Sequence, residues 1–416
     1  MRFADLFCGI GGFHAALHRL GHECVFATDI EPHAADVYEA NWGQPGGHPV
    51  LSDIRDVLDE IPEMDIICAG FPCQPFSKSG AQEGFTDQTR GTLFHDICTL
   101  AEKHKPAILF LENVPNLVKH DKGNTFSVIE SRIRELGYGF WWKILSPHKF
   151  GTPQIRTRVY IVCIRNDLIG GLDFSFPKES NQDVDVRTVL DAEVDQKYSL
   201  TDKETKWIDM WEDFLENVNA ETNLPGHPIW ADFFLGDDPI PSDLPDWKQD
   251  FIRKNRILYA NNREFIDGWL DRWGVLDIDE NGDRKFPVSR IKYEWQAGPE
   301  SRTNWENLIQ LRPSGIRVKR PNYFPALVAM AQIPIVGWLR RHITPIECAR
   351  IQDFDVDGVH GTPFVLDDSD AQSYKQLGNA VNVNMIQLIQ ERIDMFVEGA
   401  GDFPNRTVQT QLPFAE

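Results

Sequence analysis

The sequence predicts an α/β protein in which a doubly wound, mostly parallel sheet is joined by a second, smaller domain. Short, almost wholly apolar runs alternate with helically spaced apolar residues, and such runs are typical of strands that are buried on both faces of a sheet. A glycine cluster joins the first apolar run to the first helical pattern. From about residue 170 to 325 the alternation stops, and eight of the twelve tryptophans lie there, which indicates a separate domain.

The expected strands of the sheet follow one another in the chain with helical segments between most of them. They cover residues 2–7, 24–28, 65–69, 107–111, 138–142 and 159–162. In doubly wound sheets, ligands bind beyond the carboxyl ends of the strands. Asp29, Cys73 and Glu112 all follow such ends, so we expect the functional site there.

Composition limits the class of protein. The chain has 416 residues and seven cysteines, an odd number without a CxxC pair, which argues against a disulfide framework or a thiolate zinc site and indicates a reducing compartment. We expect no metal site. No apolar run has the length of a membrane span, and the start of the chain lacks the features of a signal peptide. We therefore expect a cytoplasmic protein that does not bind a membrane.

Charge is distributed unevenly along the chain. The net charge of −21 disfavours a polyanionic partner when it is taken alone. Residues 284–320, however, hold nine lysines and arginines against three glutamates, so the protein can still present one basic face. Residues 311–320 within this segment are basic and turn-rich, which suits contact with a phosphate backbone.

The first strand runs into a glycine turn, CGIGG at residues 8–12. Glycines there allow a ligand to approach the backbone at a helix N-terminus, although a purely structural turn would have the same composition. Asp29 follows the second strand, where a carboxylate can accept hydrogen bonds from ribose hydroxyls. A residue that only caps the next helix would occupy nearly the same place.

Cys73 lies between Pro72 and Pro75 directly after a strand. The prolines restrict the backbone, so the thiol is held in a defined direction, as a nucleophile requires; a lone cysteine is also a common buried hydrophobic residue. Arg156 and Arg158 alternate into a later strand and should point to the same side, which suits an anion. Two solvated arginines at a strand edge would give the same pattern.

Seven features occur in a fixed order over most of the chain. They are DLFCGIGGF at 5–13, the acidic strand end at Asp29, GFPCQPFS at 70–77, ENV at 112–114, QIRTR at 154–158, RHITPIECARIQDF at 341–354 and QLGNAVNVN at 376–384. Together they closely resemble the DNA C5-cytosine methyltransferase family.

The resemblance implies a class I methyltransferase, Rossmann-like fold that binds S-adenosylmethionine and releases S-adenosylhomocysteine. Asp29 would bind the ribose, and Asp53 and Ile54 would contact the adenine. The family often has an aromatic residue at the position of Ile30, so this chain departs from the family pattern at the adenine. The residues that match the cofactor site are Phe7, Gly9, Gly11, Asp29, Ile30, Asp53, Ile54, Pro72, Leu93, Asn379 and Val381.

The same resemblance implies the catalytic residues. Cys73 matches the nucleophile that adds to C6 of a flipped-out cytosine, and Glu112 matches the group that protonates N3. Arg156 and Arg158 match a pair near the flipped nucleotide. The expected DNA-binding residues are Ser77, Ser79 and Arg90 in the loop after the nucleophile, and Arg312, Arg317, Lys319 and Arg320 in the basic run.

The resemblance also predicts the domain organisation and the partners. We expect residues 1–170 and 356–398 to form the catalytic and cofactor-binding domain, residues 171–355 a target-recognition domain, and residues 399–416 a polar tail. The expected partner is double-stranded DNA, bound by a monomer. By analogy with prokaryotic enzymes we also expect a cognate restriction endonuclease that acts on the same site.

Three other functions share part of this pattern. A transfer-RNA cytosine methyltransferase uses the same motifs, although the large segment after QIRTR favours a DNA-reading domain. A catalytically silent homologue would have no need to keep Cys73 and Glu112. A nicotinamide dehydrogenase would share the glycine turn and Asp29, but has no use for a proline-flanked cysteine.

Overall fold

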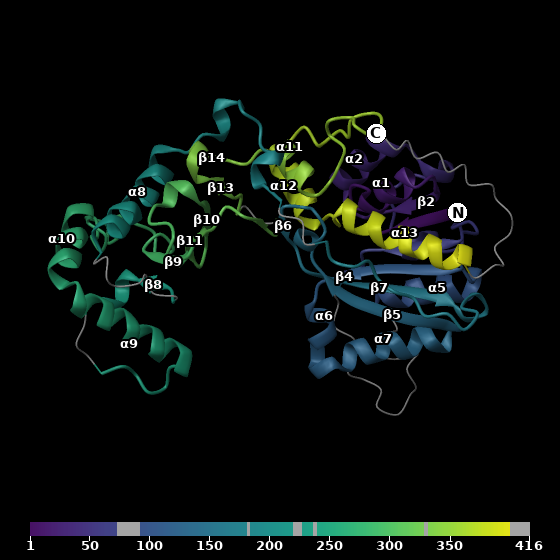
Figure 1. The fold of residues 1–416 in the computed structure, drawn as a ribbon, viewed down its shortest axis with the longest axis horizontal. Helices are drawn as coiled ribbons and strands as arrows, with labels where there is room; N and C mark the ends of the chain where they lie inside the picture. Colours follow the sequence, from purple (N-terminus) through teal and green to yellow (C-terminus); the bar gives the residue numbers. More distant parts are fainter. Residues whose placement is uncertain (73–91, 181–183, 219–226, 236–238, 328–331, 400–416) are drawn as a thin grey trace. The chain divides into compact units, whose positions relative to one another are not determined.

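The chain forms two compact units in the computed structural model, which describes residues 1–72, 92–180, 184–218, 227–235, 239–327 and 332–399 (Figure 1). The first unit consists of Met1–Val184, Ala326–Ala329 and Cys348–Glu416, and the second of Asp185–Pro325 and Met330–Glu347. Residues 171–184 and 348–355, which the sequence pattern assigned to the target-recognition domain, fall within the first unit. The boundary between the units falls within a short helix, α11 (Pro345–Ile351), because the last segment of the first unit begins at Cys348.

A mixed six-stranded sheet forms the centre of the first unit. Its strand order is β2-β1-β3-β4-β7-β5. Strands β1 to β4 run parallel, whereas β7 is antiparallel to both of its neighbours. This confirms the predicted doubly wound, mostly parallel sheet. The strands of this unit are β1 (Arg2–Leu6), β2 (Glu23–Thr28), β3 (Ile66–Ala69), β4 (Ile108–Asn113), β5 (Tyr138–Leu145), β6 (Gln154–Ile155) and β7 (Arg158–Arg165).

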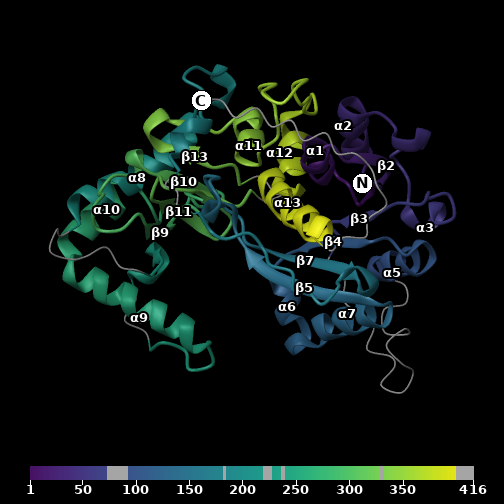
Figure 2. The same ribbon diagram turned by 45° about the vertical axis from the view of Figure 1, so that its right-hand side comes forward.

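Helices cover both faces of this sheet. On one face Phe110 of β4 meets Phe13 of α1 edge to face, with the ring centroids 5.2 Å apart, and α13 packs against α1 (Figures 1 and 2). On the other face Leu109 and Leu111 join a core that includes residues of α5 and α7. The helices are α1 (Gly12–Arg19), α2 (Pro32–Trp42), α3 (Ile54–Val57), α5 (Leu93–His104), α6 (Asn116–Lys119), α7 (Asn124–Glu135), α12 (Asp370–Asn379) and α13 (Val383–Gly399).

The second unit has its own sheet, in the order β14-β13-β10-β11-β9-β8. Its strands are β8 (Ile229–Trp230), β9 (Lys292–Gln296), β10 (Leu308–Arg312), β11 (Gly315–Lys319), β13 (Ile335–Val336) and β14 (Arg341–His342), and β12 (Phe324–Pro325) lies outside this sheet. Its α-helices are α8 (Asp202–Asn217), α9 (Asp246–Asn261) and α10 (Arg263–Trp273).

Tryptophans build much of the core of this second unit. Trp211 and Trp269 are fully buried. The indole N–H of Trp211 donates to the carbonyl oxygen of Arg290 and that of Trp269 to the carbonyl oxygen of Met210, each at a distance of 2.8 Å. A buried indole needs such a partner for its polar end. Trp247, in contrast, is 56% exposed. None of the described helices of either unit is long and apolar enough to cross a membrane.

Candidate active site

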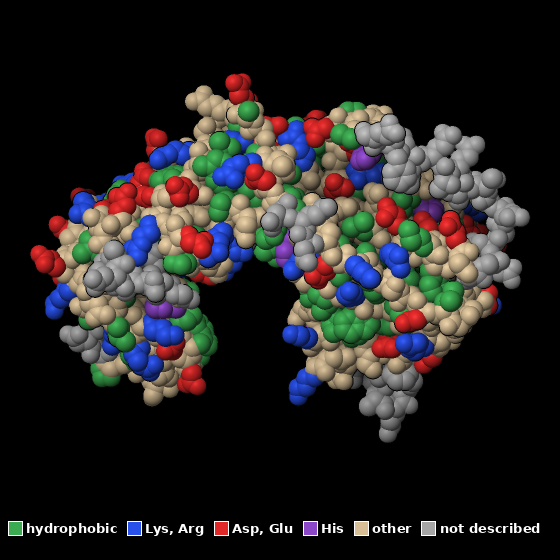
Figure 3. All heavy atoms as spheres, in the orientation of Figure 1, with side chains coloured by type: hydrophobic (Ala, Val, Ile, Leu, Met, Phe, Trp, Pro, Cys, Tyr) green, Lys and Arg blue, Asp and Glu red, His purple; other side chains and the backbone are tan. Residues whose placement is uncertain are grey.

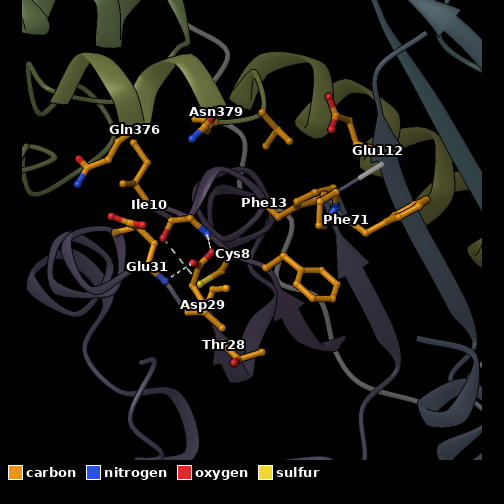
Figure 4. Close-up of a pocket in the computed structure, with 18 of the residues that line it drawn as sticks. Cys8, Ile10, Phe13, Thr28, Asp29, Glu31, Phe71, Glu112, Gln376 and Asn379 are labelled. Carbon is orange, nitrogen blue, oxygen red and sulfur yellow. Dashed lines mark hydrogen bonds between the residues drawn. The ribbon is translucent and has the colours of Figure 1, made fainter. Parts of the chain in front are cut away.

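A cavity of about 610 Å³ lies in the first unit, at the carboxyl ends of β1, β2, β3 and β4. Besides the four strand ends, residues of the segment 372–381, in and just after α12, also line it. In Figure 4, Asp29 and Glu31 lie on one side of the view and Glu112 on the other, with Phe13 and Phe71 nearer to Glu112. This is the place at which doubly wound sheets bind their ligands. Within the described ranges, no three His, Cys, Asp or Glu side chains are grouped so that they could hold a metal ion.

The glycine turn between β1 and α1 forms one side of this cavity. Phe7, Gly9 and Gly11 all have a positive φ, of 56°, 54° and 86°. A Cβ on Gly9 would meet nothing within 4 Å, so the backbone there is open to a ligand. A Cβ on Gly11 would come 2.5 Å from Nε1 of Trp42. Gly11 therefore shapes the turn and packs against α2, whereas Phe7 and Gly9 line the cavity.

Asp29 fastens the glycine turn to the end of β2. Its Oδ2 accepts the Gly9 N–H at 2.8 Å and its Oδ1 accepts the Glu31 N–H at 2.9 Å, as the dashed lines in Figure 4 show. Burial raises the pKa of Asp29, and these two backbone hydrogen bonds oppose the rise. The N-cap residue of α2 is Glu31 and not Asp29. The alternative that Asp29 is present only as the N-cap of this helix therefore does not hold.

Seven other residues expected at the cofactor also border the cavity. They are Ile30, Asp53, Ile54, Pro72, Leu93, Asn379 and Val381. Ile30 is 69% exposed. The Asp53 carboxylate accepts the N–H and the Nε–H of Arg55 at 3.0 and 2.9 Å, and the side-chain bond above all lowers its pKa to about 2. Arg55 thus holds Asp53 in its ionised form.

Glu112 lies at the end of β4 and is only 8% exposed. Its Oε1 is 3.0 Å from Nε of Arg158. Burial raises the pKa of Glu112 above its ordinary value, although the charges of Arg158 and Arg156 oppose the rise. A Cβ on Gly70 would lie 3.8 Å from Oε2 of Glu112. The end of β3 that leads to Cys73 therefore lies beside this carboxyl group.

Four expected site residues fall outside the described residues. They are Cys73, Ser77, Ser79 and Arg90. Pro72, the last described residue before them, borders the cavity. The preceding backbone is held in place, because Nδ2 of Asn113 donates to the Phe71 carbonyl at 2.7 Å.

The two arginines do not share one strand, so the expectation based on strand alternation is wrong. β6 ends at Ile155 and β7 begins at Arg158, which leaves Arg156 between two strands. Both arginines border the cavity, but they bind different partners. Arg158 pairs with Glu112, whereas the fully buried Arg156 donates to the carbonyl oxygens of Leu327, Gly378 and Ala380.

The basic run lies on β10, β11 and the turn between and after them, in the second unit. Arg312 and Arg317 both pair with Oε2 of Glu294 on β9, at 2.6 and 3.0 Å. Arg320 donates to the carbonyl of Ala297 at 2.8 Å. On the face of the second unit that Figure 3 shows, Lys and Arg side chains are interspersed with Asp and Glu. Charge on that face is thus largely balanced by neighbours.

Sequence reasoning missed several residues of the cavity wall, among them Arg55, Lys375 and Gln376. Nζ of Lys375 lies 3.1 Å from a carboxylate oxygen of Glu31, and Gln376 donates to the carbonyl of His33 at 3.0 Å. These contacts join α12 to the N-cap and first turn of α2. They connect residues more than 340 positions apart in the chain, so no local spacing rule could have found them.

Comparisons with known proteins agree with this geometry. The model of the C-5 cytosine-specific DNA methylase family matches residues 1–395. Type II methyltransferase M.AluI of Cellulosimicrobium cellulans is 34% identical over 93% of this chain and 90% of its own length. Type II methyltransferase M.HhaI of Haemophilus parahaemolyticus is 31% identical over 94% of each chain.

The chain belongs to the C-5 cytosine-specific DNA methylase family. It is an S-adenosylmethionine-dependent DNA (cytosine-5)-methyltransferase, as the resemblance in the sequence implied. DNA is its substrate, which decides against the transfer-RNA enzyme, the silent homologue and the dehydrogenase.

A solved structure supports the fold of the whole chain. A candidate DNA modification methyltransferase encoded within an E. coli prophage has a TM-score of 0.52 to this protein, at 19% identity, over 96% of this chain and 99% of that chain. At this identity the likeness concerns the fold.

Proposed function

We propose that the cavity is the methyl-transfer site, in which Cys73 and Glu112 act on the target cytosine and the glycine turn and Asp29 hold the cofactor. The observation that carries the proposal is the meeting of two strand ends. The end of β3, which leads to Cys73, lies beside Glu112, and both border the cavity that Asp29 also lines.

The residues of the cavity fit S-adenosylmethionine, which supplies a methyl group on a positively charged sulfur. Gly9 leaves its backbone uncovered on the cavity side. Each carboxylate oxygen of Asp29 accepts one backbone N–H, and a carboxylate has about four acceptor positions in all. Asp29 thus retains acceptor capacity for ribose hydroxyls, while Ile30, Asp53, Ile54 and Leu93 would surround the adenine.

The role of Cys73 follows from the chemistry of cytosine. C5 is a poor nucleophile, so the ring must be activated before C5 can take a methyl group. The Cys73 thiolate forms a bond to C6, and the electrons of the C5–C6 double bond turn C5 into an enamine-like carbon. After C5 has taken the methyl group, a base removes the C5 proton. The C6–S bond then breaks, which returns its electron pair to Cys73 and restores the aromatic ring.

The role of Glu112 is to donate a proton to N3 of the ring. The addition at C6 would otherwise leave negative charge on the ring, and a proton at N3 neutralises it. Burial raises the pKa of Glu112, which favours the protonated form that this step needs. Arg158, 3.0 Å away, orients the carboxyl group toward the cavity.

The second unit would read the DNA sequence. Because C6 is hidden in a stacked duplex, the target base must be flipped out of double-stranded DNA. Arg312, Arg317, Lys319 and Arg320 would contact the duplex, together with Ser77, Ser79 and Arg90 near Cys73. We further propose a monomeric, cytoplasmic enzyme with a cognate restriction endonuclease, in keeping with its type II methyltransferase relatives. We place target recognition in residues 171–355 and catalysis in residues 1–170 and 356–398.

Methyl transfer from labelled S-adenosylmethionine to duplex DNA and to transfer RNA tests the proposal. We expect the Cys73→Ala variant to lose at least about 10⁴-fold in rate on duplex DNA, and the wild type to leave transfer RNA unmodified. Cys98→Ala, which changes a buried cysteine of α5, serves as the matched control. DNA with fluorine at C5 of the target cytosine should form a covalent adduct with the wild type and not with Cys73→Ala. Normal methylation by Cys73→Ala would refute the proposal.

A further inference from the structure

Arg156 is the most completely buried charged group that borders the cavity, with 2% of its surface exposed. Burial, more than the nearby charge of Arg158, lowers its pKa to about 10, so it still carries its charge at neutral pH. A buried charge is stable only where hydrogen bonds replace water. The partners of Arg156 therefore show what it holds together.

Its two terminal nitrogens bind backbone carbonyls from two other segments. Nη2 donates to the carbonyls of Gly378 and Ala380 at 3.0 and 2.7 Å, and Nη1 donates to the carbonyl of Leu327 at 3.1 Å. α12 ends at Asn379, and the last carbonyls of a helix lack partners within the helix. Arg156 thus caps the carboxyl end of α12, where a positive charge also complements the helix dipole.

The segment that Arg156 caps is a wall of the cavity. Gly378, Asn379, Ala380 and Val381 all line it. The same segment also packs closely against α1, because a Cβ on Gly12 would come 2.6 Å from Cγ2 and 3.1 Å from the carbonyl oxygen of Val381. This wall therefore contacts both the guanidinium of Arg156 and Gly12, whose missing side chain leaves room for Val381.

We propose that Arg156 is a positioning residue for the cofactor: by capping α12 it holds Asn379 and Val381 against the cofactor, while Arg158 alone of the two arginines serves the target base. This inference rests on the proposed function of the cavity. It assigns the two arginines of QIRTR to different ligands, whereas the sequence pattern treated them as a pair at the flipped nucleotide.

Arg156→Lys keeps the charge but removes the forked geometry that reaches several carbonyls at once. At least one of the buried carbonyls then lacks a donor, which destabilises the wall. We expect the affinity for S-adenosylhomocysteine, measured by calorimetry without DNA, to fall about tenfold or more. We also expect faster hydrogen exchange of the backbone amides of residues 377–383. Arg158→Lys is the matched control and should keep its affinity for S-adenosylhomocysteine within about twofold.

The opposite pattern would overturn the inference. If Arg156→Lys bound S-adenosylhomocysteine like the wild type and lost only methyl transfer or DNA affinity, Arg156 would serve the nucleotide. Gly12→Ala would place a Cβ 2.6 Å from Cγ2 of Val381 in the same wall, so it provides the test if Arg156→Lys does not fold. Weaker binding of S-adenosylhomocysteine by Gly12→Ala, with unchanged DNA affinity, supports the inference, and unchanged binding overturns it. Failure of the wild type to bind S-adenosylhomocysteine would refute the proposed function instead.

Discussion

The two units hold their polar groups in different ways. In the first unit, two polar side chains of the cavity bind the backbone of other segments: Asp29 accepts two backbone N–H groups and Arg156 donates to three carbonyls. In the second unit, Arg312 and Arg317 share one acid, Glu294. A backbone partner cannot rotate away, whereas one side chain of an ion pair can exchange its partner for a phosphate. Under the proposed function, Asp29 and Arg156 are thus preorganised for a small ligand, whereas Arg312 and Arg317 would be able to exchange Glu294 for a DNA phosphate.

Glu112→Gln tests how far methyl transfer depends on a polar side chain of the cavity in the first unit. Glutamine keeps the shape and can still donate an N–H group, but it cannot supply a proton to N3. We expect methyl transfer at saturating cofactor and DNA to fall about 10³-fold, which corresponds to about 4 kcal/mol. Cofactor affinity should not change. Glu63→Gln, at an exposed position, is the matched control.

The pH dependence of the same variant separates a proton donor from a simple hydrogen-bond donor. Because burial raises the pKa of Glu112, the wild type keeps this proton to a higher pH than an ordinary glutamate. Its rate should therefore fall as pH rises through that raised pKa, and Glu112→Gln should lack this alkaline limb. A variant profile with the same limb would assign it to another group.

Trp269→Ala tests whether the core of the second unit can be damaged without affecting the first. Removing a fully buried indole that donates to the Met210 carbonyl should lower the free energy of unfolding by about 3 kcal/mol. Nine of the twelve tryptophans lie in the second unit, so tryptophan fluorescence in urea reports mainly on it. Trp247→Ala, which removes a half-exposed indole, should change stability by less than about 0.5 kcal/mol.

The sequence predicted those parts of the molecule that follow from local patterns. Leu109, Phe110 and Leu111 are all apolar because β4 is covered on both faces, and such runs identify central strands. Asp29 and Glu112 border the same cavity because parallel strands end at the same edge of the sheet. These two rules were sufficient to place the cavity.

The sequence could not predict contacts whose partners lie far away in the chain. Arg156 and Arg158 appear equivalent in QIRTR, and only the break between β6 and β7 gives them different surroundings. The acceptors of Arg156 at Gly378 and Ala380 follow more than 220 residues later. Likewise, nothing in the basic run indicates that Glu294 pairs with Arg312 and Arg317, because β9 and β11 are parallel neighbours separated by other chain segments.

Arg317→Ala tests whether the ion pairs of the second unit give way to DNA. If Arg317 exchanges Glu294 for a phosphate, the plot of the logarithm of the DNA-binding constant against the logarithm of the salt concentration should have a slope that is shallower by about 1 in Arg317→Ala. DNA affinity should fall to a similar extent for target and non-target sequences, with no change in cofactor affinity. Lys203→Ala, an exposed cation of α8, is the control. An unchanged salt slope would mean that the Glu294 pair stays closed in the complex.

Glu204→Gln gives the smallest expected effect and tests whether the pair of Glu204 with His342 stabilises the fold of the second unit. Glu204 accepts a hydrogen bond from His342 at 3.1 Å and caps the start of α8 with Thr201. The bond from His342, above all, lowers the pKa of Glu204 from 4.5 to about 2. A carboxylate with a lowered pKa stabilises the folded state above the pKa of the unfolded chain and loses this contribution as pH falls. The wild type should therefore be more stable than Glu204→Gln by less than about 1 kcal/mol near pH 7, and the difference should shrink between pH 4.5 and about 2. Urea unfolding followed by tryptophan fluorescence measures it. A difference that did not depend on pH would show that the ionised carboxylate of Glu204 does not stabilise the fold.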